Sequence, residues 1–437
     1  MAEESEITHS RVLKIAVPIV LSNATVPILG AVDVGVVGQL GEVAPIAAVG
    51  LGAIILTTLY WFFGFLRMGT AGLVGQANGA GDKAEVSALL TRSLLIAGAA
   101  GIALILLQTL FFRGAFAISR ASEEVETLAA AYLTIRIWTA PFAISVYALT
   151  GWMVAMERTH GVFWVQLVMN GINILLDFWF VLGLGWGVEG VAFATVIAEI
   201  TGALLALWFC RDAFENIEWR NWLRVFDRAR LNHMMALNRD ILLRSAMLMA
   251  IFTSFVLIAT YLGDVTVAAN EVLIQFLHIT AYAMDGFAFA AEAIVASAIG
   301  QRNREKLRKA WRYCMLWGTW TCLLLALGFA LGGGFLIDTM AKSVEVQDVA
   351  RTYLFWMVLA PITGALAWIL DGVFIGATRG RDMRDTMVVC LAIYVVAVVV
   401  LVPLFGNHGL WCALNISLLA RGLTLLRRYP GLERSVG

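Results

Sequence analysis

The segment 387–406 reads MVVCLAIYVVAVVVLVPLFG and contains no charged side chain. A helix needs about 20 mostly apolar residues to cross the hydrocarbon core of a bilayer, so this segment is long enough to span one. The rest of the chain has the same character, because 60% of its 437 residues are hydrophobic and only 14% are charged. Soluble globular proteins carry roughly 25% charged residues. The composition therefore predicts a polytopic membrane protein.

Apolar runs of spanning length follow one another along the whole sequence. We identify twelve of them, near 12–37, 46–75, 87–112, 128–154, 162–184, 188–211, 239–262, 266–300, 310–335, 350–376, 386–405 and 409–426. Lys and Arg are concentrated in alternate connections, and the other connections contain only Arg113, Arg120, Lys342 and Arg351. Because cytoplasmic loops carry an excess of basic residues, this alternation predicts a multi-pass protein of the cytoplasmic (inner) membrane with both termini in the cytoplasm.

The two halves of the sequence resemble each other. Three patterns recur in the same order: Gly75-Gln76 with Asn78 matches Gly300-Gln301 with Asn303, Ala140-Pro141 matches Ala360-Pro361, and Gly187 with Gly190 matches Gly406 with Gly409. Parallel repeats of this kind are typical of transporters. We therefore expect an all-α protein with 12 transmembrane helices. It would comprise an N-terminal six-helix lobe at 1–211, a cytoplasmic linker at 212–238 and a C-terminal six-helix lobe at 239–437.

The linker contains aromatic and basic side chains at helical spacing. On a helix, one side would carry Trp219, Trp222, Leu223 and Phe226, and another side would carry Arg220, Arg224 and Arg228. This pattern predicts an amphipathic helix that lies at the membrane surface and joins the two halves. A solvated linker helix is the alternative.

Charge and motif content exclude several classes of function. The 31 Lys and Arg balance the 31 Asp and Glu, so nucleic-acid binding is not expected. The sequence has no HExxH, GxxxxGK[ST] or GxSxG motif, and its five cysteines contain no CxxC pair. We therefore expect no enzyme activity, no cofactor and no structural metal centre. A membrane-embedded enzyme would require a clustered His/Asp/Glu set, and a channel would require a re-entrant filter segment, which neither half offers. An ion gradient is the energy source that remains.

Carboxylates inside the apolar runs of the first half are the most informative residues. Asp33 lies in the first run, and Asn170, Asn173 and Asp177 in the fifth have the spacing i, i+3, i+7 that places them on one helical face. Thr195 and Glu199 lie four residues apart in the sixth run. A buried charge in a membrane is costly unless it faces a partner or a polar cavity. Each acid is therefore either a proton or Na⁺ site, or a structural contact paired with an arginine within a span.

The second half contains further carboxylates of the same kind. Asp285 and Glu292 are seven residues apart and share a helical face, Glu271 lies nearer the end of that run, and Asp371 lies in the tenth run. The alternative for each is again an ion pair, for which the arginines within spans are Arg67, Arg136 and Arg244. We treat Asn170, Asp285, Glu292 and Asp371 as secondary candidates for ion coupling.

Several stretches carry a resemblance to one transporter family. They are the opening region with Pro18, Asp33, Gly38 and Gly41, the repeated Gly-Gln pair, AANEVL at 268–273, AYAMDGFAFAAE at 281–292, LDGVFIGATRGRDMRD at 370–385 and GNHGLWCAL at 406–414. In these stretches the sequence resembles the multidrug and toxic compound extrusion (MATE) transporters, and within them the DinF-like branch. The resemblance covers essentially the whole chain.

The resemblance implies a fold and a site. Two six-helix lobes would form a V around a central cavity, and the protein would export organic compounds or drugs in exchange for H⁺ or Na⁺ by alternating access. The cation site that prokaryotic members carry in the N-terminal lobe matches Asp33, Asn173, Asp177 and Thr195. The Na⁺-linked carboxylates of another bacterial branch align poorly, because the sequence after Asp371 is offset from their pattern.

The resemblance also leaves alternatives for partners and cargo. The branch favours H⁺ over Na⁺, and the expected partners are small organic substrates and membrane lipids, with the chain working as a monomer. The runner-up function is a lipid or lipid-linked-glycan flippase of the same superfamily. Such a flippase needs a basic cavity for phosphate groups, and here acids within the spans outnumber arginines.

Overall fold

The computed structural model describes residues 6–39, 41–119, 121–215 and 217–436, and the described residues form helices without a strand. Among them are twelve helical segments long and apolar enough to cross a membrane, which confirms the predicted number of spans. Contacts group the chain into two compact units. We call residues 21–78 and 82–232 the N-terminal unit, and residues up to Val20, 79–81 and 233–437 the C-terminal unit. The lobe boundaries expected at 211 and 239 stay a prediction.

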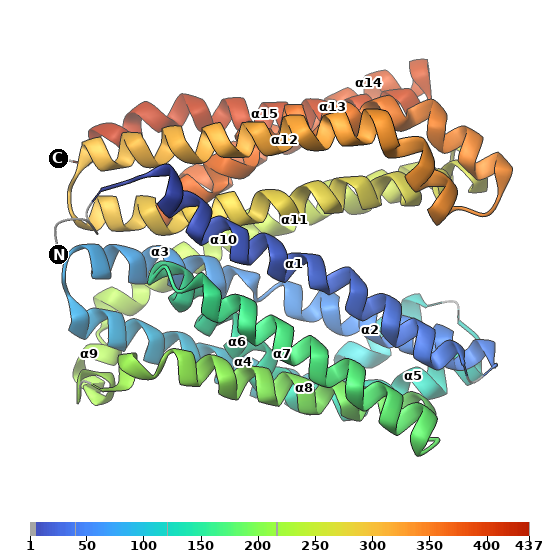
Figure 1. Cartoon of the computed structure of the whole chain (residues 1–437), viewed down its shortest axis with the longest axis horizontal. Helices are drawn as coiled ribbons and strands as arrows, with labels where there is room; N and C mark the ends of the chain where they lie inside the picture. Colours follow the sequence, from blue (N-terminus) through green and yellow to red (C-terminus); the bar gives the residue numbers. More distant parts are fainter. Residues whose placement is uncertain (1–5, 40, 120, 216, 437) are drawn as a thin grey trace. The chain divides into compact units, whose positions relative to one another are not determined.

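The N-terminal unit contains most of α1 and the helices up to α9. Its spans are α1 (His9–Gly38), α2 (Val43–Trp61) with α3 (Gly64–Gly79), α4 (Lys83–Ile118), α5 (Glu123–Arg136) with η2 (Ile137–Thr139) and α6 (Ala140–Ala155), α7 (Thr159–Asp177) with η3 (Phe178–Gly183), and α8 (Gly187–Phe209). Figure 1 shows these helices running alongside one another, and the main packing pairs are α4 with α6, α7 with α8, and α2 with α5. One apolar core lies around Trp152 and Leu149, which are almost completely buried.

Three of these spans are interrupted, and the break in the fourth span has a proline beside it. Pro141 lacks a backbone N–H and cannot continue the hydrogen-bond ladder of a preceding helix, so the chain passes through the short turn η2 before α6 begins. Helix α4 approaches this break closely at Gly101, where an added Cβ would lie 2.3 Å from the Pro141 nitrogen. The equivalent Pro361 of the second half lies inside an uninterrupted α13.

The C-terminal unit consists of long helices. They are α10 (Arg228–Thr260), α11 (Asp264–Gly300), α12 (Arg304–Met340), α13 (Val344–Gly376), α14 (Gly380–Phe405) and α15 (Asn407–Arg434), and Figure 1 labels each of them. Its core includes Trp411, which packs against Phe255 with 4.6 Å between ring centroids. Asn270 and Asn407 exchange two side-chain hydrogen bonds of 2.8 and 2.9 Å, and Trp411 donates to Asn270 at 2.9 Å.

The linker does not form the single amphipathic helix that its sequence pattern predicts. It folds as three short segments, η4 (Arg211–Phe214), η5 (Ile217–Arg220) and α9 (Trp222–Val225), and the long helix α10 begins at Arg228. The reason is a set of tertiary contacts with α4. Buried Arg92 donates to the backbone oxygens of Arg224 and Val225 at 2.7 and 2.8 Å, so these carbonyls accept from a side chain instead of continuing a helix.

Candidate functional site

The four first-rank residues of the sequence analysis meet inside the N-terminal unit. Asp33 comes from α1, Asn173 and Asp177 from α7, and Thr195 from α8. Asp177 and Asn173 are 0% and 1% exposed, so the acid has left water almost completely. The spacing within α7 places Asn173 and Asp177 one turn apart on the same face, as predicted.

The Asn173 amide links both acids to Thr195. In the orientation that gives every atom a suitable partner, its nitrogen donates to Asp33 Oδ1 and to Asp177 Oδ2, both at 3.1 Å. Its oxygen then accepts from Thr195 Oγ1 at 3.0 Å. Rotated by half a turn, the amide still bonds to Thr195, because its nitrogen then donates to that hydroxyl at 3.0 Å and its oxygen faces the carboxylates. Thr195 allows both orientations since a hydroxyl donates and accepts.

The two carboxyl groups also contact each other. Asp33 and Asp177 lie within hydrogen-bonding reach of one another. The second oxygen of Asp177, Oδ1, is buried and has no hydrogen-bond partner among the described residues. Two acids so close repel each other when both are ionised, so a proton held between them or a bound cation relieves the repulsion.

Asn170 lies one turn before Asn173 and has a supporting position. It is buried and donates to Thr25 Oγ1 of α1 at 2.8 Å, while it accepts from Gln166 at 2.9 Å. These contacts fasten α7 to the part of α1 that carries Asp33. The structure thus gives Asn170 structural partners and does not bring it to the carboxylates.

Helix α7 changes its hydrogen-bond pattern directly after Asp177. The next six residues, Phe178–Gly183, form a π-helix, in which each N–H bonds five residues back. Such widened turns occur often at functional sites, because they re-aim neighbouring side chains at some cost in stability. Asp177 is therefore the last residue of the regular helix.

An ion pair is formed by Arg136 and Glu199, for which the sequence left open either an ion site at Glu199 or pairing with an arginine within a span. Arg136 at the end of α5 donates to Glu199 Oε1 of α8 at 2.6 Å and to Tyr132 Oη at 2.7 Å. Thr139 hydrogen-bonds the other carboxylate oxygen of Glu199. The structural alternative named for Glu199, pairing with an arginine within a span, is what the structure shows. The signal in the sequence was a lone arginine inside a span, five residues before Pro141.

Asp371 of the C-terminal unit is also paired. Its carboxylate contacts Arg244 of α10 and Arg421 of α15, and Arg421 Nε donates to Asp371 Oδ1 at 3.3 Å. All three side chains are buried. Arg421 is not among the arginines that the sequence pattern placed within spans, so its burial beside Asp371 is a finding of the structure. Pairing with Arg244, an arginine within a span, is the structural alternative named for Asp371, and the second partner, Arg421, was not among those named.

The other carboxylates of the C-terminal unit lie on α11. Glu292 is buried and Glu271 is exposed, while Asp285 is partly buried and close enough to Arg421 to attract it. These acids belong to the C-terminal unit, whereas Asp33 and Asp177 belong to the N-terminal unit. The structure thus forms the group around Asp33 without them.

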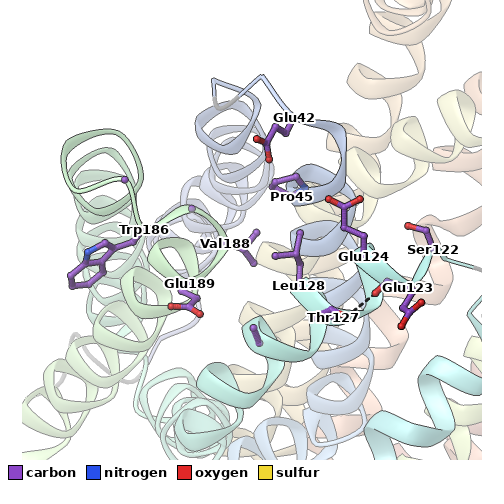
Figure 2. A pocket seen from close by; sticks show the side chains of 13 residues that line it. Glu42, Pro45, Ser122, Glu123, Glu124, Thr127, Leu128, Trp186, Val188 and Glu189 are labelled. Carbon is purple, nitrogen blue, oxygen red and sulfur yellow. Dashed lines mark hydrogen bonds between the residues drawn. The ribbon is translucent and has the colours of Figure 1, made fainter.

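A pocket of about 970 Å³ lies at one end of the N-terminal unit (Figure 2). Glutamates line it from the starts of three helices: Glu42 before α2, Glu123 and Glu124 on α5, and Glu189 on α8. Trp186 comes from the turn before α8. The pocket is not lined by Asp33, Asn173, Asp177 or Thr195.

Comparison with known proteins decides the family. The model of the MatE family matches the chain twice, over residues 18–179 and 241–403. The chain belongs to the MatE family. The double match also confirms the internal repeat that the recurring patterns predicted. The family is one of membrane transporters, so this MatE protein is a membrane transporter.

Individual relatives support the same conclusion. The chain is 37% identical to the DNA damage-inducible protein F of Escherichia coli over 413 residues, which cover 94% of this chain and 90% of the relative. It is 24% identical to a probable multidrug resistance protein NorM of Bradyrhizobium diazoefficiens, with 97% and 94% of the two chains covered. The family and the DinF-like branch predicted from the sequence are therefore confirmed.

Solved structures show the same fold. The Vibrio cholerae MATE transporter VcmN in its bent form superposes with a TM-score of 0.86 at 19% identity, covering 98% of this chain and 97% of that chain. A MOP superfamily transporter from Pyrococcus furiosus superposes with a TM-score of 0.82 at 18% identity, covering 97% and 96%. The predicted all-helical fold class is confirmed by this likeness.

Proposed function

We propose that this MatE protein is a secondary antiporter that exports organic compounds across the cytoplasmic membrane in exchange for H⁺ or Na⁺. The observation that carries the proposal is the convergence of Asp33, Asn173 and Asp177, with Thr195, in one unit, where Asn173 and Asp177 are buried and Asp33 and Thr195 are partly buried. A lone buried acid is costly in a membrane protein, and a buried pair of acids is costlier still, unless the pair binds a cation or a proton. The entering ion would supply that charge.

The Asn173 amide gives a chemical reason why the site accepts either ion. With its nitrogen towards the acids, the amide donates to both carboxyl groups, an arrangement suited to a site that contains no metal ion. With its oxygen towards them, it would add a third hard oxygen ligand to the two carboxylates, which suits Na⁺. On the resemblance to the DinF-like branch, we propose H⁺ as the coupling ion.

Ion binding drives transport only if the ion binds two conformations unequally. We propose that Asp33 and Asp177 are neutralised in one conformation and ionised in the other, and that Asn173 and Thr195 orient them or ligate Na⁺. The π-helix after Asp177 links the site to the shape of α7, and the hydrogen bond of Asn170 to Thr25 links it to the position of α1. Alternating access of the two lobes would then follow from occupancy of the site.

Cargo and partners belong to the same proposal. The relatives named for multidrug resistance and detoxification support small organic substrates. We propose a monomer in contact with membrane lipids, with both termini in the cytoplasm and no role for nucleic acid. Among buried arginines, Arg136, Arg244 and Arg421 each contact a carboxylate, which argues against a basic cavity for the phosphate of a flippase substrate.

Reconstitution tests the proposal. Purified protein in liposomes would be given an imposed pH gradient or an imposed Na⁺ gradient, against a panel of fluorescent organic cations and organic anions and a fluorescent phospholipid. We expect gradient-dependent movement of at least one organic dye and none of the phospholipid. Movement of the phospholipid alone would support the flippase, and dye movement that ignores both gradients would reject coupled antiport.

A further inference from the structure

We propose that Arg136 is the fixed counter-charge of the coupling-ion site, and that Glu199 sets how much of that charge the site experiences. Both are positioning residues, since neither is among the four residues that would meet the ion. The inference deepens the proposed function and rests on it, because it concerns how tightly the site around Asp33 and Asp177 holds its ion. The sequence pattern left Glu199 as either an ion site or an ion-pair partner and named Arg136 only as a possible partner, and the family match gives neither residue a role.

The position of Arg136 follows from the break in the fourth span. Arg136 is the last residue of α5, and η2 follows because Pro141 cannot extend the helix backwards. The side chain is 9% exposed, so its charge is not screened by bulk water. An arginine remains protonated even when buried, which makes it a permanent positive charge at this level of the membrane.

Glu199 holds the guanidinium from one side. Arg136 Nη2 donates to Glu199 Oε1 at 2.6 Å, and Nη1 donates to Tyr132 Oη at 2.7 Å. The remaining nitrogen, Nε, is buried and has no hydrogen-bond partner among the described residues. Two of the three guanidinium nitrogens therefore have a hydrogen-bond partner, and Nε has none among the described residues.

The charge of Arg136 reaches both acids of the site. Glu199, the partner of Arg136, lies one turn after Thr195 on α8, so the ion pair lies on the face of that helix that carries Thr195. Arg136 hydrogen-bonds neither Asp33 nor Asp177, and its effect on their carboxylates is electrostatic. The other titratable or charged groups that face this cluster come from neighbouring helices. They are Tyr60 on α2, Arg67 on α3, Tyr132 on α5 and Tyr147 on α6.

Arg136 and Glu199 should have opposite effects on how tightly the acids of the site hold the ion, because their charges are opposite. Without the positive charge of Arg136, the acids of the site would hold a proton or Na⁺ more tightly. Without the negative charge of Glu199, Arg136 would act on the acids undiminished, and they would hold the ion more weakly. A unit charge acting on another within a protein interior can change half-saturation by about tenfold in either direction.

The test compares three variants of the full-length protein in detergent: Arg136→Gln, Glu199→Gln and the double variant. The readout is the infrared carbonyl band of protonated carboxylic acids. Only the share of this band that disappears in Asp33→Asn and Asp177→Asn is used. Its intensity is measured as a function of pH, and at fixed pH as a function of NaCl concentration. This readout needs no substrate. Asp240→Asn with Arg384→Gln is the matched control, because that pair lies in the C-terminal unit.

We expect Arg136→Gln to move the midpoint of the band to higher pH by about one unit, or to lower the half-saturating NaCl about tenfold. Glu199→Gln should move both in the opposite direction. The double variant should return close to the wild-type midpoint, because it removes one charge of each sign, and it also spares the fold an unpaired buried charge. Arg136→Lys should stay closer to wild type than Arg136→Gln does.

A purely structural ion pair predicts a different pattern. Both single variants would then lose thermal stability and shift the midpoint in the same direction, or not at all, and either result overturns the inference. If no part of the band depends on Asp33 and Asp177, the proposed function fails instead. The two failures are therefore distinguishable.

Discussion

Asn173 on α7 lies one hydrogen bond from Asp33 on α1, with 3.1 Å between the amide nitrogen and Asp33 Oδ1. The same amide reaches Asp177 and Thr195, so one side chain joins three helices at the site. Its geometry suggests how to distinguish the two coupling ions, because a proton needs only a carboxyl group whereas Na⁺ needs several oxygen ligands.

The first prediction uses this difference. If Na⁺ is the coupling ion, Thr195→Val and Asn173→Ala should each raise the half-saturating NaCl by at least about tenfold, because each removes an oxygen from the ligand set. If H⁺ is the coupling ion, Thr195→Val should change the pH dependence of efflux by less than about threefold in proton concentration. Gradient-driven dye efflux from proteoliposomes measures both.

Thr201→Val is the matched control for Thr195, since Thr201 lies on the same helix, is partly buried and donates to the backbone oxygen of Ile197 on its own helix. A loss of efflux in the Thr201 variant equal to that in the Thr195 variant would contradict a local role for Thr195.

The second prediction concerns Asp371. Its carboxylate lies between Arg244 and Arg421, all three buried, so Asp371→Asn leaves two buried arginines without their anion. We expect a loss of about 3–5 kcal/mol in stability, the usual result of breaking a buried ion pair from one side. Thermal unfolding in detergent would measure it, with the exposed acid of the Arg351 pair, Asp338→Asn, as control.

Any Asp371→Asn protein that folds should retain the ion dependence of wild-type transport. If the Asp371→Asn variant is as stable as wild type but its transport no longer depends on the ion, Asp371 belongs to the coupling site.

The sequence alone predicts the fold of this protein more completely than its site. Each spanning helix satisfies its own backbone hydrogen bonds within one apolar run, so local composition was sufficient to count the spans. The helical face of Asn173 and Asp177 likewise follows from spacing within one helix. The meeting of that face with Asp33 depended on family resemblance, since no local pattern joins residues so far apart in the chain.

Tertiary contacts account for the differences. The linker pattern predicted one helix, but Arg92 of α4 binds the carbonyls of Arg224 and Val225 and ends α9 there. Arg421 appeared as one more basic residue near a helix end, and only the packing of α15 against α13 brings it to Asp371.

The third prediction tests the linker contacts. Arg92→Ala removes both hydrogen bonds to the linker backbone and leaves Glu85 without its 2.7 Å partner. We expect faster trypsin cleavage between residues 217 and 230 by at least about tenfold, since local opening exposes cleavage sites. Arg211→Ala, an exposed arginine of the same linker, should cleave like wild type. Equal cleavage of the two variants would show that Arg92 does not hold the linker.

The fourth prediction concerns orientation in the membrane. The distribution of Lys and Arg places Arg228 and Lys306 on the cytoplasmic side, and Glu123 and Lys342 on the external side. Single cysteines at these positions, in a protein whose five native cysteines are replaced, should react with an impermeant maleimide from outside cells only at 123 and 342. Labelling of position 228 in intact cells would reverse the predicted topology.

The central claim is that Asp33 and Asp177 form one ion-coupled site. The most direct measurement is gradient-driven efflux by Asp33→Asn, Asp177→Asn and the double variant, using the organic dye that the wild-type protein exports. We predict that each single variant loses efflux at least about a hundredfold while dye binding persists, and that the double variant is no worse, because both changes disable the same site. Robust efflux by either single variant, with unchanged ion dependence, would contradict the claim and move coupling to Asp285, Glu292 or Asp371.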